Sequence, residues 1–221
     1  MRRLIALALV AALAGAGCSD NRRYETAVCA LVDVSGTYAD QVGEVLRIVK
    51  AGIVPQLRPG DSLFVITVDS NSYNEDDLVA ALRLDYVPSK ANDQKLAFAQ
   101  RLDAFAAAVR RARYTDLTGA MLLCRDHLED SGAGRRVMLV FSDMKEEIQP
   151  GLKRELPPGS LAGVHVAALN VIKLDADSAD PARYRARLDR WAERLAAAGA
   201  ASWTVLLDAV KIPEYLRGLE H

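Results

Sequence analysis

The stretch TAVCALV at residues 26–32, followed at once by DVSGT at residues 33–37, decides the fold of this chain. A continuous apolar run of this length, bounded by polar residues, is typical of a β-strand that is buried on both faces of a sheet. Two further runs have the same form, SLFVITV at residues 62–68 and VMLVF at residues 137–141, and each is followed by an Asp within two residues. The sequence therefore predicts a sheet that is covered on both sides.

Segments with a helical spacing of apolar residues separate the strands. These segments are residues 38–54, 92–113, 117–128, 184–198 and 213–219. Further buried strands are expected at residues 164–172 and 202–207, whereas the alternation of apolar and charged residues at 78–86 favours an edge strand over a short helix. Strands that alternate with helices predict an α/β domain: a doubly wound, mostly parallel sheet of about six strands, with one antiparallel edge strand and helices on both faces.

The composition indicates one sizeable globular domain. Of the 221 residues, 51% are hydrophobic and 26% are charged, which excludes a largely disordered chain. The 28 Lys and Arg residues are balanced by 29 Asp and Glu residues, so the chain lacks the basic character of a nucleic-acid-binding protein. We therefore expect a single domain over residues 24–221 and no nucleic-acid partner.

The first residues predict an export signal. Arg2 and Arg3 precede an unbroken apolar run at residues 4–14, which is too short to span a membrane and has the length of a signal-peptide core. Residues 1–17 are therefore expected to be a signal peptide that is removed from the mature protein. An exported protein of this kind works outside the cytoplasm.

The residues around Cys18 resemble the processing site of bacterial lipoproteins, in which small residues precede the cysteine that becomes lipidated. Gly15 departs from that pattern, because Leu is usual three places before the cysteine, and ordinary cleavage after Ala16 is the alternative. With lipidation, Cys18 anchors the protein to the cell envelope facing the periplasm, residues 18–23 form a short tether, and Ser19 in place of Asp favours the outer membrane over the inner. Without lipidation, the protein is soluble in the periplasm or secreted.

Two cysteines remain besides the one at the processing site. Cys29 lies in the first expected strand and Cys124 in a later expected helix. An oxidising compartment permits a disulfide between them, and the alternative is a pair of buried, unreactive thiols. The sequence leaves both open, because it does not supply the Cα separation that a disulfide requires.

Oxygen-bearing side chains follow the strands at the places where a ligand is expected to bind. In an open α/β sheet, ligands bind beyond the carboxyl ends of the strands, near the point where the strand order reverses. Asp33, Ser35 and Thr37 follow the first strand, Thr115 precedes a helix, and Asp143 follows a later strand. Hard oxygen donors with no His or Cys nearby favour Mg²⁺, with Mn²⁺ or Ca²⁺ as alternatives.

These residues resemble the metal-ion-dependent adhesion site of the von Willebrand factor A domain, whose pattern is Asp-x-Ser-x-Ser, then Thr, then Asp. The resemblance implies that Ser35, Thr37 and Thr115 bind the cation through their hydroxyl groups. It also implies that Asp33 and Asp143 bind the cation directly or through water.

The resemblance covers about residues 24–210 and implies a Rossmann-like α/β fold. Two positions depart from the family pattern. Thr37 replaces the usual second Ser and keeps the hydroxyl group. Met144 follows Asp143 where Gly is common, which is expected to narrow the loop without removing a ligand.

The resemblance implies a non-enzymatic module for metal-dependent protein–protein interaction, of the adhesion or scaffold type. In such a module, an Asp or Glu carboxylate of an unidentified protein partner replaces a water molecule on the cation. The membrane is contacted only through the lipid anchor.

Two alternatives stay open at this point. The loop DVSGT is similar to the Asp-x-Asp-x-Thr loop of haloacid dehalogenase phosphatases, in which the first Asp, here Asp33, attacks phosphorus. That reading predicts a metal-dependent hydrolase, but Ser35 stands where the family has its general acid, and no paired Asp-Asp follows the later strand. The other alternative is a scaffold of the same fold with a vestigial metal site.

Neighbouring acidic segments are assigned to structural roles. Asp69 is expected to form a turn, and Asp116 to cap the helix that follows it. The triplet KEE at residues 145–147 is expected to be a solvated segment at the rim of the site.

Overall fold

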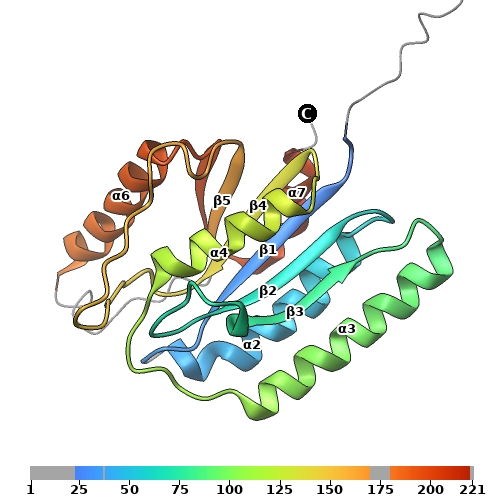
Figure 1. Cartoon of the computed structure of the whole chain (residues 1–221), viewed down its shortest axis with the longest axis horizontal. Coiled ribbons are helices and arrows are strands. Elements are labelled where there is room, and N and C mark those ends of the chain that lie inside the picture. Colours follow the sequence, from blue (N-terminus) through green and yellow to red (C-terminus); the bar gives the residue numbers. More distant parts are fainter. Residues whose placement is uncertain (1–22, 37, 170–179, 220–221) are drawn as a thin grey trace, which may run out of the picture.

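The computed structural model describes residues 23–36, 38–169 and 180–219. Its sheet is made of β1 (Thr26–Asp33), β2 (Ser62–Val68), β3 (Leu78–Arg83), β4 (Arg135–Phe141), β5 (Val164–Leu169) and β6 (Ser202–Leu206). The strand order is β3-β2-β1-β4-β5-β6, and every pair is parallel except β2 with β3. This arrangement confirms the doubly wound, mostly parallel sheet with one antiparallel edge strand (Figure 1).

Helices cover both faces of the sheet (Figure 1). They are α2 (Val42–Ile48), α3 (Pro88–Ala108), α4 (Leu117–Asp130), α6 (Pro181–Ala197) and α7 (Ile212–Gly218). Short 3₁₀ or π turns are η1 (Tyr38–Gln41), η2 (Val49–Ile53), η3 (Val54–Gln56), η4 (Glu75–Asp77) and η5 (Ala209–Lys211). None of the described helices combines the length and the apolar character needed to cross a membrane.

Successive side chains of the central strand β1 enter two separate cores. Val28 and Ala30 join the core beneath α2, α3 and α7. Cys29 and Leu31 join the core beneath α4 and α6. Because alternate residues of a strand point to opposite faces, a strand covered on both sides needs apolar residues at every position, as the run at 26–32 provides.

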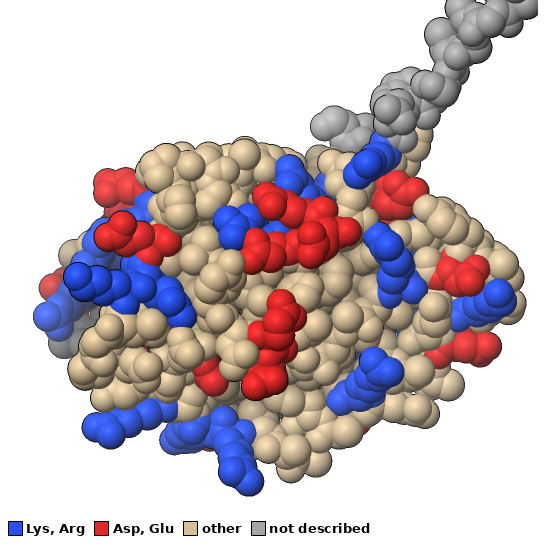
Figure 2. All heavy atoms as spheres, viewed as in Figure 1, with Lys and Arg blue, Asp and Glu red and all other residues tan. Residues whose placement is uncertain are grey.

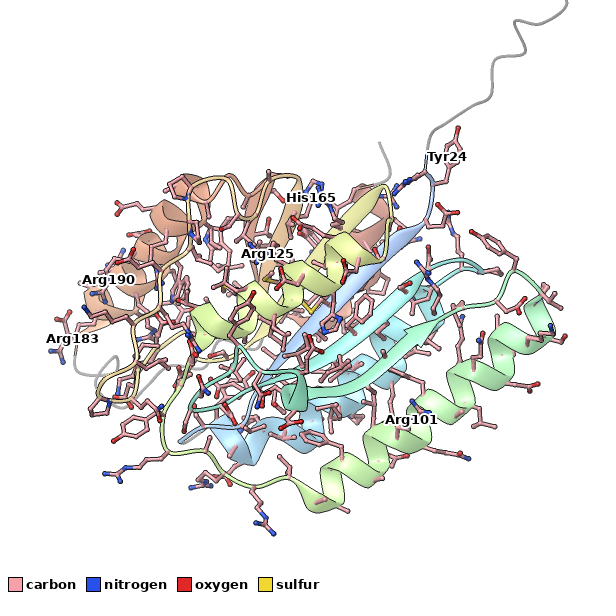
Figure 3. All side chains as sticks on the ribbon, viewed as in Figure 1. Tyr24, Arg101, Arg125, His165, Arg183 and Arg190 are labelled. Atoms are coloured by element: carbon pink, nitrogen blue, oxygen red, sulfur yellow. A yellow bond between two sulfur atoms is a disulfide. The ribbon has the colours of Figure 1, made fainter. Side chains whose placement is uncertain are left out.

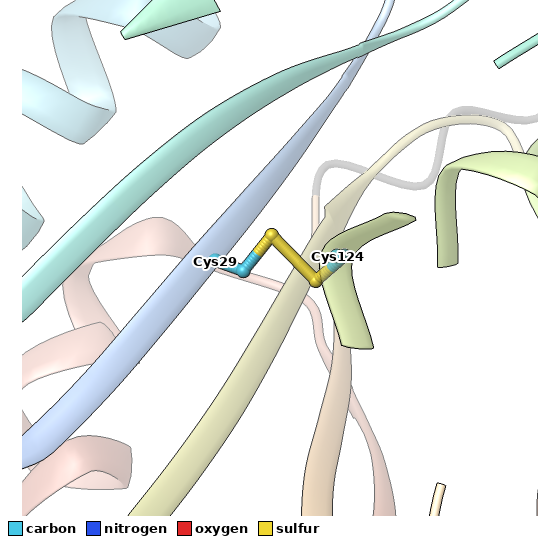
Figure 4. The surroundings of a disulfide bond; sticks show 2 residues. All are labelled: Cys29 and Cys124. Carbon is cyan, nitrogen blue, oxygen red and sulfur yellow. A yellow bond between two sulfur atoms is a disulfide. The ribbon is translucent and has the colours of Figure 1, made fainter. Parts of the chain in front are cut away.

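A disulfide joins the central strand to a covering helix. Cys29 in β1 and Cys124 in α4 are bonded, and their Cα atoms lie 6.0 Å apart (Figure 4). The two cysteines are 95 residues apart in the sequence, so the bond restricts a long loop of the unfolded chain. It also fixes α4 against the strand that leads to the candidate site.

Helix α3 differs at both ends from the predicted 92–113. It begins at Pro88, because proline fits the first turn of a helix, where its missing N–H has no intrahelical partner. It ends at Ala108, and the chain then turns away so that Ala112 pairs with Ser35 in an isolated parallel bridge. A contact with a distant loop, which local sequence does not encode, therefore ends this helix early.

The described chain begins and ends at the same end of the sheet (Figure 1). Figure 3 shows Tyr24 just before β1, and the Leu219 carbonyl accepts a hydrogen bond of 2.9 Å from Arg135, the first residue of β4. The carboxyl ends of the parallel strands lie at the opposite end. The predicted signal peptide, Cys18 and Ser19 lie outside the described residues.

Candidate metal centre

Three loops meet at the carboxyl end of the sheet, where the strand order reverses between β1 and β4. Gly36 donates to the Ala112 carbonyl at 3.3 Å and Ala112 donates to the Val34 carbonyl at 2.9 Å, which joins the first loop to the second. Thr115 and Glu147 exchange backbone hydrogen bonds of 2.9 and 3.0 Å, which joins the second loop to the one after β4. The backbone therefore fixes all three loops relative to one another.

Side chains from these loops form one hydrogen-bonded group around Asp33. The backbone N–H and the hydroxyl of Ser35 both donate to Asp33 Oδ1, at 2.8 and 2.5 Å. Ser35 Oγ also lies 2.5 Å from Thr115 Oγ1. Ser142 donates to Asp33 Oδ2 at 2.6 Å. Three of the predicted ligands thus lie in contact, although 80 residues separate Ser35 from Thr115.

Asp143 is a second buried carboxylate beside this group. Its Oδ1 accepts a hydrogen bond of 2.7 Å from the Lys145 backbone. Burial raises the pKa of Asp143, while that hydrogen bond and the positive charges of Arg187 and Lys145 oppose the rise. The negative charge of Asp143 contributes in turn to the raised pKa of Asp33, which places the two carboxylates within electrostatic range of each other.

Removal from water dominates the electrostatics of Asp33, which is only 1% exposed. Burial raises the pKa of this carboxyl group to about 6, although hydrogen bonds from Ser142 and Ser35 lower it. Within the described part of the chain, no Lys, Arg or His forms a salt bridge with Asp33 or Asp143. The charge of such a buried carboxylate is removed either by protonation, which the raised pKa makes easier, or by a bound cation.

The donors available to such a cation are all oxygens. Over residues 23–36, 38–169 and 180–219, no group of three or more His, Cys, Asp or Glu residues is placed to hold a metal ion. The donors gathered at this strand end are instead two carboxylates and the hydroxyls of Ser35 and Thr115. The chemistry of these oxygens fits a hard divalent cation that keeps several waters. Thr37, the remaining predicted ligand, lies outside the described residues.

Met144 holds the turn that presents Asp143. Its φ of 61° lies in the left-handed region, which favours glycine. Its side chain is buried in the core beneath α4 and α6, and its carbonyl accepts a hydrogen bond of 2.9 Å from Trp191 Nε1. Packing on one side and this hydrogen bond on the other keep a non-glycine residue in a conformation that costs free energy.

The acidic side chains next to the site have structural partners. Asp116 accepts from the Gly119 backbone N–H at 2.7 Å, which confirms the predicted helix cap, and from Arg154 Nε at 2.8 Å. Asp69 accepts from the Asn71 backbone N–H at 2.8 Å, which confirms the predicted turn. Neither carboxylate belongs to the hydrogen-bonded group around Asp33.

Glu146 corrects the expectation that residues 145–147 form a solvated segment. Its side chain is only 16% exposed. Its Oε1 accepts from the backbone N–H and the hydroxyl of Thr118, at 2.7 and 2.5 Å, and its Oε2 accepts from Arg194 at 2.8 Å. The physical reason is the start of α4, because unpaired N–H groups in the first turn of a helix attract a carboxylate.

Two contributors, Ser142 and Glu146, are absent from the set predicted from sequence. The sequence does contain a signal for Ser142. It lies between a buried strand and Asp143, so its hydroxyl group is at the strand end where the predicted ligands gather. Glu146 had none, because nothing in the triplet KEE distinguishes a helix-capping carboxylate from a solvated one.

No protein-family model and no curated protein sequence matches this chain, but several solved structures resemble it. The pilus adhesin SpaC from Lactobacillus rhamnosus GG matches 91% of this chain and 30% of its own, with a TM-score of 0.54 and 15% identity. A von Willebrand factor type A protein from Catenulispora acidiphila matches 90% of this chain and 42% of its own, with a TM-score of 0.54 and 11% identity. The conserved hypothetical protein BatB from Bacteroides thetaiotaomicron matches 88% of this chain and 96% of its own, with a TM-score of 0.52 and 12% identity.

At these identities the likeness shows the fold alone. It confirms the prediction of a Rossmann-like α/β fold of the von Willebrand factor A type. This chain spans less than half the length of the first two proteins and nearly all of the third.

Proposed function

We propose that this chain is a non-enzymatic, metal-dependent protein-interaction module of the cell envelope. One observation carries the proposal: Asp33 and Asp143 are both buried at the point where the strand order reverses, and the hydroxyl groups of Ser35, Ser142 and Thr115, which come from all three loops, gather around Asp33. Among the described residues, neither carboxylate has a salt bridge to offset its charge. A divalent cation would supply that charge and would use the oxygens already gathered there.

Mg²⁺ is the proposed cation, with Mn²⁺ or Ca²⁺ as alternatives. Asp33, Ser35, Thr37, Thr115 and Asp143 are its proposed ligands. When bound, the cation supplies a position at which an Asp or Glu carboxylate of a protein partner can coordinate. The chain itself offsets the charge of the cation with two carboxylates and holds the three loops in place through their backbone hydrogen bonds.

The envelope location rests on the signal at residues 1–17 and the lipoprotein-like Cys18, and the disulfide between Cys29 and Cys124 suits an oxidising compartment. The likeness to a pilus adhesin supports the same location. The described N-terminus and the candidate site lie at opposite ends of the sheet (Figure 1). Attachment through Cys18 would therefore present the site away from the membrane.

The surroundings of Asp33 favour binding over the hydrolase alternative. A nucleophilic carboxylate needs an oxygen that reaches the substrate. Both oxygens of Asp33 accept hydrogen bonds, from Ser35 and Ser142, and the residue is almost fully buried. Ser35, which stands where the general acid would be, donates to Asp33 instead.

The direct test is thermal unfolding of the full chain with chelator, Mg²⁺, Mn²⁺ or Ca²⁺. A cation that binds only the folded state at one hundred times its Kd stabilises it by about 2.7 kcal/mol, or roughly 5–10 °C in Tm for a chain of this size. We expect this shift in the wild type and its loss in Thr115→Val, which removes one hydroxyl ligand and keeps the side-chain shape. Thr204→Val, three strands away from β1 in the sheet, is the matched control and keeps the shift.

Each result has a defined meaning. A shift of equal size in Thr115→Val would contradict the proposed ligand set. If no cation raises Tm or binds in calorimetry, the site is vestigial and the scaffold alternative holds. Hydrolysis of a phosphomonoester that depends on Asp33 would establish the hydrolase instead.

A further inference from the structure

Helix α6 has one face formed by arginines. Arg183, Arg187, Arg190 and Arg194 follow one another at intervals of four, three and four residues, which places them along one side of a helix. Figure 3 shows Arg183 and Arg190 on the outer side of α6, and Figure 2 shows basic side chains gathered at that end of the molecule. The remaining arginine, Arg185, lies on a different face.

This arginine face borders a pocket that begins one residue after Asp143. The pocket has a volume of about 240 Å³ and lies between α6 and the loop after β4. Its charged lining residues are Lys145, Glu146, Arg187, Arg190 and Arg194. Four cationic side chains therefore face one carboxylate, next to the candidate metal site.

The cations of the pocket differ in what they contact. Arg194 bonds to Glu146 at 2.8 Å and lies over the Trp191 ring, 4.1 Å from its centroid, so its role is to hold the loop. Arg190 is exposed, and its Nε donates only to the Ala186 carbonyl of its own helix, at 3.3 Å, with no ion pair to a described acidic residue.

Two further cations complete the lining. The positive charge of Arg187 acts on Asp143, which ties the pocket electrostatically to the metal site. Lys145 pairs with the exposed Glu147 at 2.5 Å. Arg190 is therefore the cation of the pocket that is best placed to bind an incoming anion.

We infer that this pocket is a carboxylate subsite, and that the partner is an acidic protein segment with two carboxylates close together. One carboxylate binds at the metal site, and the second binds in the pocket against Arg190 with the charge of Arg187 beside it. Guanidinium groups bind carboxylates through paired, charge-assisted hydrogen bonds, which gives both strength and orientation. The inference rests on the proposed function, because it extends the same partner contact.

A protein segment fits the position of the pocket better than a lipid surface does. The pocket lies at the carboxyl end of the sheet, whereas the described N-terminus leaves from the opposite end (Figure 1). A chain attached through Cys18 would therefore hold the arginine face away from its own membrane. Charge complementarity then favours an acidic segment of another protein.

The test compares two blocked peptides, GDGEG with two carboxylates and GDGQG with one, as probes for the full chain in Mg²⁺ at low salt. We expect the wild type to bind GDGEG roughly tenfold or more tightly than GDGQG, as one added charge-assisted contact predicts. Arg190→Glu should lose this preference and still bind GDGQG like the wild type. Arg185→Glu makes the same change on another exposed position of α6 and should keep the preference.

The outcomes separate the subsite from the metal site. If Arg190→Glu retains the preference, or Arg185→Glu loses it equally, the subsite is overturned, while Mg²⁺-dependent binding of GDGQG leaves the proposed function standing. If GDGEG binds as tightly in chelator as in Mg²⁺ and its binding still requires Arg190, the subsite stands and the metal-dependent function fails. Failure of both peptides to bind the wild type overturns the inference.

Discussion

Asp33 and Asp116 are buried to the same degree at the same end of the sheet, but their charges are offset differently. Asp116 is 0% exposed and accepts from Arg154, from the Gly119 N–H and from the Ser72 N–H. Among the described residues, Asp33 accepts only from uncharged donors, and its pKa is raised to about 6. Thr115 and Asp116 are adjacent in the chain, so one segment contributes to both arrangements.

The difference shows which carboxylates the fold uses for its own stability. Asp116 caps α4 and ties it to the loop after β2 and to Arg154, and Glu146 caps the same helix with Arg194 as its cation. The pair Asp33 and Asp143 has no bonded cationic side chain among the described residues. Among the described residues, arginine partners are provided for Asp116 and Glu146 and not for Asp33 and Asp143, and this difference supports the proposal of an external cation.

The largest expected effect is the loss of stability in Asp116→Ala. This change removes a helix cap and leaves the guanidinium of Arg154, which is largely buried, without its carboxylate, which together cost roughly 3–5 kcal/mol. Urea unfolding measures the loss. Asp40→Ala breaks the exposed pair with Arg111 and should cost no more than about 1 kcal/mol. Equal losses in the two variants would remove the distinction on which the comparison depends.

Substitutions of Met144 measure the strain in the turn that leads into the site. Met144→Ala deletes a buried side chain and should cost roughly 2–4 kcal/mol. Met144→Gly loses slightly more packing but accepts the positive φ, so it should be more stable than the Ala variant by about 1 kcal/mol. Chemical denaturation of both variants provides the comparison. A glycine variant less stable than the alanine variant would show that the turn carries no strain.

The sheet could be predicted from the sequence, because a strand that is buried on both faces is a continuous run of apolar residues. The predicted limits 62–68 are those of β2. The edge strand expected at 78–86 is the antiparallel β3, which ends three residues earlier, at Arg83. The end of α3 could not be predicted, because a bridge between Ser35 and Ala112 sets it. Local spacing reports which face of a segment is buried, and it does not report where a distant loop interrupts a helix.

The candidate site was predictable to the extent that it follows the strand ends. Asp33, Ser35 and Thr115 lie together as expected, because the carboxyl ends of parallel strands share one edge of the sheet. The buried network of Glu146, Thr118 and Arg194 could not be predicted, because it depends on how α6 packs beside α4. Which acidic residue receives an arginine partner is decided by tertiary packing.

Asp33→Asn should change stability in opposite directions with and without metal. In chelator at neutral pH, the variant should be more stable than the wild type by about 1–2 kcal/mol, because it no longer buries a charge. In Mg²⁺ it should lose the stabilisation of the wild type, because an amide does not offset the charge of the cation. Calorimetry of both proteins in both buffers measures this reversal in the order of their stabilities. A variant that is destabilised in chelator would indicate that the negative charge of Asp33 serves the fold.

The smallest expected effect concerns Asp77, a buried acid near Asp116 that has no arginine partner among the described residues. Burial, followed by the negative charge of Asp69, raises the pKa of Asp77 to about 7, and its Oδ2 has no hydrogen-bond partner. A raised pKa means that the folded state holds its proton more tightly, so stability falls as pH rises from about 4 to about 7 and then levels off.

Asp77→Asn removes this dependence and isolates it from that of Asp33. We expect the variant to exceed the wild type in stability by about 1 kcal/mol at pH 8, and the difference to vanish near pH 4. Urea unfolding at both pH values measures it, and the exposed Asp76→Asn is the control. If the difference in stability is the same at both pH values, Asp77 does not titrate between them. The positive charge of Arg154 would then offset the charge of Asp77 as well as that of Asp116.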